Sequence, residues 1–328
     1  MKRLAAMLAA WAGAAAVAAG AGYAFTDRTP DSPAVAGDYQ RYVTITGDGT
    51  NLSLWYENRS AGTIEMRTST TGYAGFGTPV TATGLSGLAH PKIYGGGGGG
   101  GCVGFFWDSA QTAPNGIKRL TSSDGVNWSG ATQVTVAGAP YTTQIWGVVG
   151  YFEDVSGDTD VLYYTQGTGA NEKVYRATAT DGVSFAHQGT AFENPGTTGC
   201  GAGVSVGSQV LYEPNEGQYL LIWCGESTTA NIGYATSSDG VSFAHHGEVV
   251  LETAAHDDLE ETSFVINGAD LVGVYTADFG GDSSNHIGAY TGVVPEPATM
   301  GLIVFGGALA LAGRRRKSTQ GRTEGGAR

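Results

Sequence analysis

The sequence predicts an all-β protein, a five-bladed β-propeller, on the strength of one repeat and its spacing. A motif built around Asp-Gly-Val and ending in an aromatic residue occurs three times, at residues 122–128, 179–185 and 237–243. Aliphatic residues aligned on these copies, and on two degraded ones, recur at steps of 53, 57, 58 and 55 residues, at Ile64, Ile117, Val174, Ile232 and Ile287. A repeat of this period is typical of propellers and solenoids.

Each repeat contains short alternating runs separated by Gly-rich turns, which predict about four strands per repeat. A closed ring hides the sheet edges that an open array exposes, so we prefer five blades to an open solenoid or a pair of sandwiches. Asp-Gly is a strong signal for a type I′ hairpin turn, and we therefore expect Asp124, Asp181 and Asp239 to form turns rather than to act as catalysts. The fourth strand of the second repeat is expected at residues 133–136, and the fifth repeat lacks an obvious fourth strand.

The sequence of the N-terminus is typical of a segment that is removed during export. Lys2 and Arg3 precede an Ala-rich apolar run, and small residues offer cleavage after Ala21 or Ala24. This order predicts a signal peptide with a helix over residues 1–24; the alternative is a retained N-terminal anchor. Residues 25–38 contain Pro, Asp and Ser and read as a linker or a loosely docked arm, and residues 39–292 as the propeller.

The charge of the exported part is strongly negative. The chain of 328 residues has 30 acidic and 17 basic side chains, and residues 25–294 hold 28 and 9 of these, a net charge of −19. Such a surface should repel nucleic acid. Three cysteines are present, and Cys200 with Cys224 in one repeat is a candidate disulfide, although buried free thiols, including that of Cys102, are an equal alternative.

Three signals follow one another at the C-terminus. A Pro-Glu-Pro sequence precedes an apolar stretch at 298–313, which is nearly long enough for a transmembrane helix. A basic cluster follows, which the positive-inside rule places in the cytoplasm. The defining residues are Pro295, Glu296, Pro297, Arg314, Arg315 and Arg316.

Over residues 294–317 this order closely resembles the PEP-CTERM sorting signal, and residues 318–328 form an unusually long basic tail after it. The resemblance implies recognition by an exosortase in a Gram-negative bacterium and cleavage near Pro-Glu-Pro. It further implies an inner-membrane intermediate, followed by release or attachment at the cell surface or in an extracellular matrix. A plain tail anchor is the alternative.

The blocks at 117–128, 174–185 and 232–243 are similar to those of five-bladed propellers of the arabinanase/β-fructosidase type. This resemblance implies two carboxyl groups at one mouth of the central channel, one an acid and the other a base or nucleophile. The start of each inner strand would deliver a side chain there, which makes Asp38, Glu260 and Glu261 candidate catalytic residues. His90, Gln144 and Trp146 are then candidate binding residues. Acidic residues are expected on the first three blades, but His90 and Gln144 stand where two of them should be.

The densest acidic run is at 256–261, and its carboxylates offer oxygen ligands for Ca²⁺. The alternative is a solvated loop before the fifth blade, and no other metal or cofactor is expected. Three functions remain open. The preferred one is an exported, surface-sorted propeller that binds extracellular carbohydrate, such as a polysaccharide, or a matrix partner. The alternatives are a glycoside hydrolase of the arabinanase/β-fructosidase type and a structural surface protein without a ligand.

Overall fold

A computed structural model describes most of the chain between Tyr23 and Val293. The described residues are 23–28, 40–73, 75–95, 101–111, 116–141, 145–153, 159–167, 171–194, 203–204, 207–214, 216–225, 231–250, 256–267, 270–279 and 285–293. From Ala24 onward they belong to one compact unit, Ala24–Val294. They contain no helix, so none that is long and apolar enough to cross a membrane. The predicted signal-peptide and transmembrane helices lie outside the described residues.

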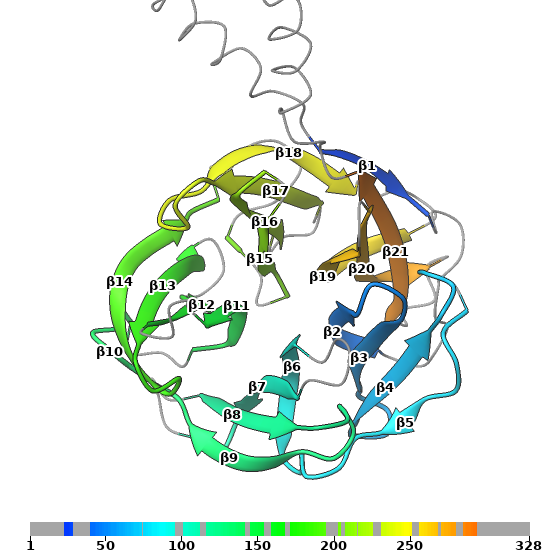
Figure 1. The fold of residues 1–328 in the computed structure, drawn as a ribbon, viewed down its shortest axis with the longest axis horizontal. Helices are drawn as coiled ribbons and strands as arrows, with labels where there is room; N and C mark the ends of the chain where they lie inside the picture. The colour runs from blue at the N-terminus through cyan, green and yellow to red at the C-terminus, as the bar shows by residue number, and fades with distance from the viewer. Residues whose placement is uncertain are drawn as a thin grey trace, which may run out of the picture. The chain divides into compact units, whose positions relative to one another are not determined.

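Five sheets stand around a central axis, as predicted (Figure 1). Their strands pair antiparallel within each blade, and one sheet gains a parallel strand described below. Blade 1 contains β2 (Gln40–Gly47), β3 (Leu52–Asn58), β4 (Thr63–Ser69) and β5 (Val80–Thr81). Blade 2 contains β6 (Leu88–Gly95), β7 (Cys102–Asp108), β8 (Ile117–Ser122) and β9 (Ser129–Gln133). Blade 3 contains β11 (Gly147–Glu153), β12 (Asp160–Gln166), β13 (Lys173–Ala179) and β14 (Ser184–Phe192).

The remaining two blades follow the same plan, with the first strand of each nearest the axis. Blade 4 contains β15 (Gln209–Glu213), β16 (Gln218–Cys224), β17 (Ile232–Ser237) and β18 (Ala244–Val250). Blade 5 contains β19 (His256–Asn267), β20 (Asp270–Phe279) and β21 (Asn285–Val293). The five aligned aliphatic residues all fall on the third strand of their blade and are at most 4% exposed. The repeat therefore marks one buried position in each sheet.

The ring closes with a strand from the other end of the chain. β1 (Ala24–Asp27) pairs antiparallel with β21 and is the outer strand of blade 5. The sequence left that blade without a fourth strand and read residues 25–38 as a linker or a loosely docked arm. Residues 25–27 are part of a docked strand, which agrees with the docked arm, the second of the two interpretations given above, and not with a linker. The strand itself could not be predicted, because four residues are too few to show a strand period and their partner lies at the opposite end of the chain.

The Asp-Gly turns differ from the predicted type I′ geometry. Among the described residues the only non-glycine residues with positive φ are Tyr42 and His90, so the turn aspartates do not adopt it, whereas a type I′ turn needs positive φ at both central positions. Instead, Asp124 Oδ1 accepts the N–H groups of Val126 at 2.9 Å and Asn127 at 2.8 Å, and Gly125 alone takes φ +74°. Asp181 and Asp239 bond the equivalent N–H groups, so all three are turn formers.

The same turns join neighbouring blades. Trp55 of blade 1 donates its Nε1–H to the Gly125 carbonyl of blade 2 at 2.9 Å, and Tyr163 of blade 3 donates its hydroxyl to the Gly240 carbonyl of blade 4. The backbone of Thr83 in blade 1 also bonds that of Val126 and Trp128 in blade 2. The motif is thus repeated because it ties a blade to the preceding one.

One strand prediction is wrong in blade 2. The fourth strand there is β9. β10 (Thr135–Ala137) overlaps the residues 133–136 predicted for it, but pairs parallel with β14 of blade 3. Apolar clusters fill the spaces between adjacent blades, and Trp55 and Trp223 are buried in them at 2% and 0% exposed. Cys102 is a buried free thiol. Cys224 is buried as well, and its candidate partner Cys200 lies outside the described residues, so that disulfide stays a prediction.

Candidate functional site

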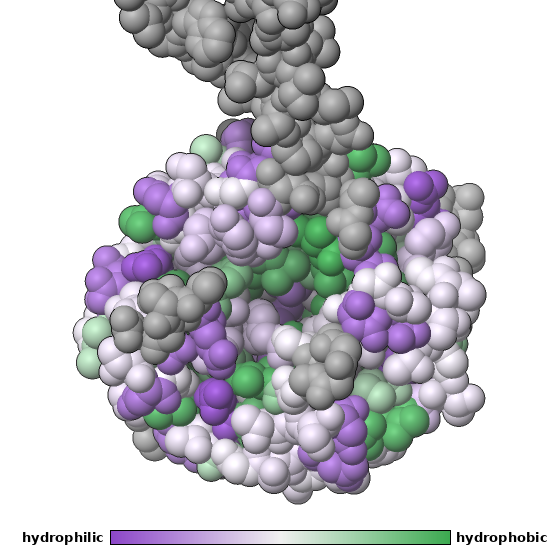
Figure 2. Space-filling view, viewed as in Figure 1, coloured by the Kyte–Doolittle hydropathy of each residue, from purple (hydrophilic) through white to green (hydrophobic). Residues whose placement is uncertain are grey.

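The central channel has two mouths, which we name after the inner strands. At the strand-start mouth lie residues at or near the first residues of β2, β6, β11 and β19, together with the end of β3. At the strand-end mouth lie the last residues of β2 and β6. The space-filling view shows the ring hollowed at its centre (Figure 2).

A row of four aromatic rings lies at the strand-start mouth. Tyr42 of β2 stacks on His90 of β6 with ring centroids 3.5 Å apart, and His90 stacks on Trp107 of β7 at 4.8 Å. Trp107 continues the row to Trp146, just before β11, at 5.9 Å. His90 is 7% exposed, whereas Tyr42, Trp107 and Trp146 are half-buried. The row therefore presents three partly exposed rings drawn from three blades.

The backbone at the start of this row is strained in the same way in two blades. Tyr42 has φ 54° and His90 has φ 48°, and each lies where the pairing register of its inner strand shifts. A left-handed conformation is costly for bulky residues, and such strain tends to occur at functional sites. The bulges turn both rings into one stack.

Carboxylates of the preceding blades hold both strained residues. The N–H of Tyr42 donates to Glu261 Oε2 of blade 5 at 3.2 Å, and that of His90 reaches Glu57 Oε2 of blade 1 at 3.5 Å. His90 Nδ1 lies 3.3 Å from the Trp146 carbonyl oxygen. Glu261 also accepts the hydroxyl of Thr276 and is 2% exposed. Contacts from neighbouring blades of the propeller therefore hold Tyr42 and His90 in place.

Two arginines flank Tyr42. The guanidinium of Arg41 lies 5.6 Å and that of Arg59 5.3 Å from the centre of the Tyr42 ring, within the range of cation–π attraction. Arg41 forms ion pairs with both Glu260 and Glu261, and Arg59 Nε lies 3.2 Å from Glu57. Three carboxylates and two guanidinium groups are therefore gathered around one ring.

Burial and these charges shift the pKa values at the mouth. Burial lowers the pKa of Arg41, but the carboxylates of Glu261 and Glu260 outweigh it, so its pKa lies above the usual value. Burial, reinforced by Glu261, raises the pKa of the Tyr42 hydroxyl. Burial lowers the pKa of His90 to about 3. Tyr42 and His90 are therefore both uncharged at neutral pH.

A buried lysine crosses the channel below the row. Lys92 of β6 is 2% exposed, and its Nζ donates to the carbonyls of Gly207 at 3.2 Å, Val43 at 3.4 Å and Thr262 at 3.4 Å. These carbonyls belong to blades 4, 1 and 5. Burial lowers the pKa of Lys92 to about 7, although the negative charge of Glu261 acts to raise it. One side chain thus connects four of the five blades.

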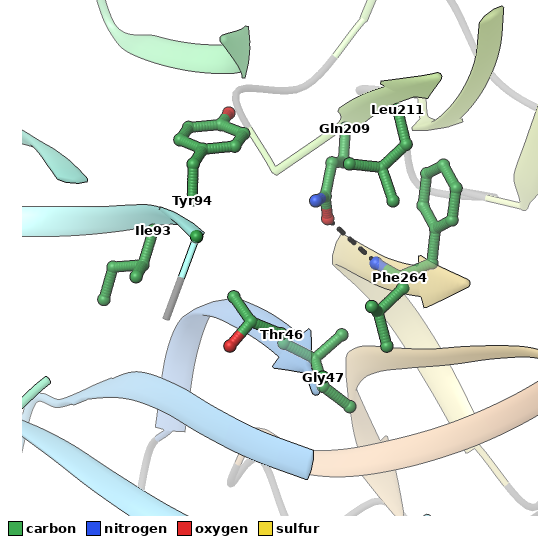
Figure 3. Close-up of a pocket in the computed structure, with 10 residues that line it drawn as sticks. Thr46, Gly47, Ile93, Tyr94, Gln209, Leu211 and Phe264 are labelled. Carbon is green, nitrogen blue, oxygen red and sulfur yellow. Dashed lines mark hydrogen bonds between the residues drawn. The ribbon is translucent and has the colours of Figure 1, made fainter. Parts of the chain in front are cut away.

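The strand-end mouth is chemically different. A hollow of about 150 Å³ lies there between β2, β6, β15 and β19 (Figure 3). Its lining is mostly apolar, with Ile93, Leu211 and Phe264 beside the amide of Gln209. Gln209 Oε1 accepts the Phe264 N–H at 2.8 Å and the Ser263 hydroxyl. Charged groups are absent from this lining, so the candidate site is the strand-start mouth.

The structure brings together all four candidate catalytic and binding residues that it describes. His90, Trp146, Glu260 and Glu261 all lie at the strand-start mouth, whereas Asp38, Gln144 and the sorting-motif residues 295–297 and 314–316 lie outside the described residues. The solvated-loop interpretation of residues 256–261 is wrong, because they begin β19 and Glu261 is buried. The predicted catalytic and binding roles remain predictions.

Sequence reasoning missed Tyr42, Trp107 and Lys92. Trp107 lies near the end of β7, a second strand and not an inner one, and Tyr42 reaches the mouth only because of its bulge. The signal for Lys92 was available, since a lysine inside an apolar inner strand must find buried partners. Within the described part of the chain no group of three or more His, Cys, Asp or Glu side chains is arranged to hold a metal ion, and the calcium prediction for residues 256–261 remains untested.

Comparisons with known proteins bear on both the C-terminus and the propeller. Residues 293–317 match the PEP-CTERM protein-sorting motif, as predicted, and the motif indicates export and exosortase processing in a Gram-negative bacterium. Among curated proteins, none matches the sequence.

Solved structures of glycoside hydrolases share the fold. A thermostable family-43 glycoside hydrolase has 13% identity and a TM-score of 0.58, over 78% of this chain and 89% of its own. The α-L-arabinofuranosidase from Lactobacillus brevis has 17% identity and a TM-score of 0.52, over 78% and 90%. A GH32 β-fructofuranosidase from Bombyx mori has 12% identity and a TM-score of 0.53, over 80% and 62%. At such identities the likeness shows the fold alone. The chain consists of a five-bladed propeller that resembles arabinanase and β-fructosidase structures, followed in the sequence by a PEP-CTERM sorting motif.

Proposed function

We propose that this exported propeller binds extracellular carbohydrate at its strand-start mouth. The observation that supports this most is the row of Tyr42, His90, Trp107 and Trp146, held in place by strained backbone in two blades. The C–H groups on one face of a sugar ring are apolar, and aromatic faces are electron-rich and rigid. A row of partly exposed rings is therefore suited to a chain of sugar units.

The polar groups around the row complement sugar hydroxyls. Arg41, Arg59, Glu57 and Glu260 offer charged donors and acceptors, which make shorter and stronger hydrogen bonds than neutral groups do. Because each of these charges already has an opposite partner, the mouth has little net charge to attract an ion. The ligand class that fits is a neutral polysaccharide or oligosaccharide.

A glycoside hydrolase remains the second candidate, favoured by the carboxylates gathered in a fold shared with such enzymes. A hydrolase needs two carboxyl groups facing each other across the scissile bond, one of them able to give a proton. Glu260 and Glu261 both bind Arg41, and Glu261 and Glu57 also hold backbone N–H groups. These bonds give the carboxylates a positioning role, which is why we prefer binding; Asp38 would have to supply the second group.

The remaining parts of the proposal concern location. We propose that the signal peptide lies within residues 1–24 and is cleaved after Ala21 rather than after Ala24, because Ala24 pairs with Val293 in β1. The membrane-spanning part of the sorting signal is proposed at 298–313. The chain would then pass through an inner-membrane intermediate to the cell surface or the extracellular matrix. No cofactor is required for binding, although a calcium ion at residues 256–261 is compatible with the proposal.

A glycan array followed by calorimetry on the exported protein tests this function. Tyr42→Ala and Trp146→Ala should each weaken binding of an array hit about tenfold or more, because each removes a stacking face. Tyr212→Ala is the matched control, since Tyr212 is an aromatic residue 45% exposed at the end of β15. Unchanged affinity in both mouth variants would contradict the proposal.

The same protein can be assayed on chromogenic arabinosides and on fructans. Product release that disappears in Glu261→Gln would favour the hydrolase. A protein that neither binds nor hydrolyses any glycan tested would favour a structural surface role.

A further inference from the structure

The ring-closing strand covers the residues that lead into the sorting motif. β1 pairs with the last four residues of β21, in the register Ala24–Val293, Phe25–Gly292, Thr26–Thr291 and Asp27–Tyr290. β20 pairs with the same four residues from the other side. With β1 in place, the chain is therefore held on both edges up to Val293, where the sorting motif begins.

Side chains secure β1 at this position. The half-buried ring of Phe25 lies 5.2 Å from that of Tyr234 and 6.2 Å from that of Tyr290. Arg28 Nε donates to Thr291 Oγ1 at 2.7 Å, and its backbone N–H donates to the Ala289 carbonyl at 2.9 Å. Tyr275 donates its hydroxyl to Asp27 at 3.1 Å. β1 is thus a docked strand, although a short one.

Enzymes that cleave or bind a chain segment commonly take it in extended form, through its backbone groups. The motif implies cleavage near Pro295-Glu296-Pro297, and only Val294 separates Pro295 from the last paired residue. The residues on the N-terminal side of the cut are therefore those that β1 and β20 hold. An enzyme can grip them only if their outer edge is free.

We infer that β1 controls access to the sorting site: residues 290–293 are the docking strand for the sorting protease, and the chain's own N-terminal strand competes for it. Cleavage breaks one C–N peptide bond. Water or an acceptor amine takes the acyl carbon, and the tail leaves with a free amine. β1 changes none of this chemistry and acts only on access.

A reversible lock tests the inference directly on the full chain. Thr26 and Thr291 are opposed in the register, so Thr26→Cys with Thr291→Cys allows a disulfide that ties β1 down. In detergent micelles, a proline-specific endoprotease provides a probe of access at residues 295–297, and membranes containing exosortase provide the physiological reaction. The oxidised protein should be cleaved about tenfold more slowly than the reduced one in both assays, and Thr26→Cys alone should show no redox effect.

A second pair of variants acts in the opposite direction. Phe25→Ala removes the anchoring ring and should raise the cleavage rate about tenfold, whereas Thr26→Ala, at an exposed position of the same strand, should leave it unchanged. Hydrogen exchange of the Tyr290–Val293 amides reports undocking, and circular dichroism reports the intact propeller. Equal cleavage of locked and reduced protein overturns the inference. So does unchanged or slower cleavage of an undocked Phe25→Ala protein, since it would make β1 irrelevant or part of the recognised shape.

Discussion

Lys92 offers the sharpest test of how the ring is held together. Its ammonium group lies 3.2–3.4 Å from carbonyl oxygens of three other blades, and burial lowers its pKa from 10.5 to about 7. Between these two values the unfolded chain carries a proton on Lys92 that the folded chain has largely lost. The free energy of unfolding must therefore rise with pH over this window.

The size of the effect follows from the two pKa values. Between pH 7 and pH 9 the difference in bound protons amounts to about 2 kcal/mol of added stability. For a domain of this size that corresponds to a rise of roughly 4–8 °C in melting temperature. Histidine and carboxylate groups have ordinary pKa values below this window, and tyrosine has one above it. The Cys102 thiol titrates in the same window, and because burial raises its pKa it opposes the change. The contribution of Lys92 is therefore the difference between the wild type and a variant that keeps Cys102.

Denaturant unfolding at pH 7, 8 and 9 measures the effect, with Lys92→Met as the test variant. Methionine keeps most of the volume and cannot ionise, so the variant should lose the contribution of Lys92 to the pH dependence whatever its absolute stability. Lys118→Met is a matched control, because Lys118 is partly exposed and pairs with Asp108 at 2.7 Å. If the wild type gains no stability relative to Lys92→Met from pH 7 to pH 9, the reasoning is refuted, since the three carbonyls would then hold the proton more firmly than burial expels it.

Three further predictions concern the mouth and the packing. Burial lowers the pKa of His90 from 6.5 to about 3, so the free energy of unfolding should fall by about 2 kcal/mol as the pH drops from 6.5 to 4.5. His90→Asn should remove that loss in acid unfolding curves; parallel curves for the two proteins would contradict this. Trp55→Phe should lower stability by about 1–2 kcal/mol in urea, because it deletes the bond to the Gly125 carbonyl; no loss would show that the bond is not needed between blades 1 and 2. Gly273→Ala should lower the melting temperature, since a Cβ there would lie 2.0 Å from Tyr290 Cζ and overpacking costs about 1–3 kcal/mol. Gly247→Ala, with its nearest neighbour at 3.9 Å, is the control.

The fold could be predicted because the same physical demand recurs in every blade. One aliphatic side chain of each third strand must be buried between sheets, and this places Ile64, Ile117, Val174, Ile232 and Ile287 at nearly equal spacing. The turn type could not be predicted from Asp-Gly alone. A carboxylate that accepts two N–H groups of its own turn stabilises a conformation in which only the glycine has positive φ.

The site was predictable only in part, for a geometrical reason. Strand starts could be located to within a few residues, which was enough to find His90, Trp146, Glu260 and Glu261. The direction of a side chain at such a position depends on bulges, because one extra residue reverses the face on which the following side chains lie. Tyr42 lies at the mouth because of such a bulge, and the local sequence pattern does not predict that bulge.

The distribution of basic residues links the site to the composition. Residues 25–294 contain only nine basic side chains and 28 acidic ones. Three of the nine, Arg41, Arg59 and Lys92, nevertheless lie together at the strand-start mouth and just below it. Glu57, Glu260 and Glu261 meet them there, so attraction and repulsion nearly cancel at this mouth while the protein as a whole stays strongly negative. A surface of that kind repels polyanions and attracts cations over long range. On the function proposed above, the mouth would select by stacking and hydrogen bonding, which is why we expect a neutral glycan to fit it better than a charged one.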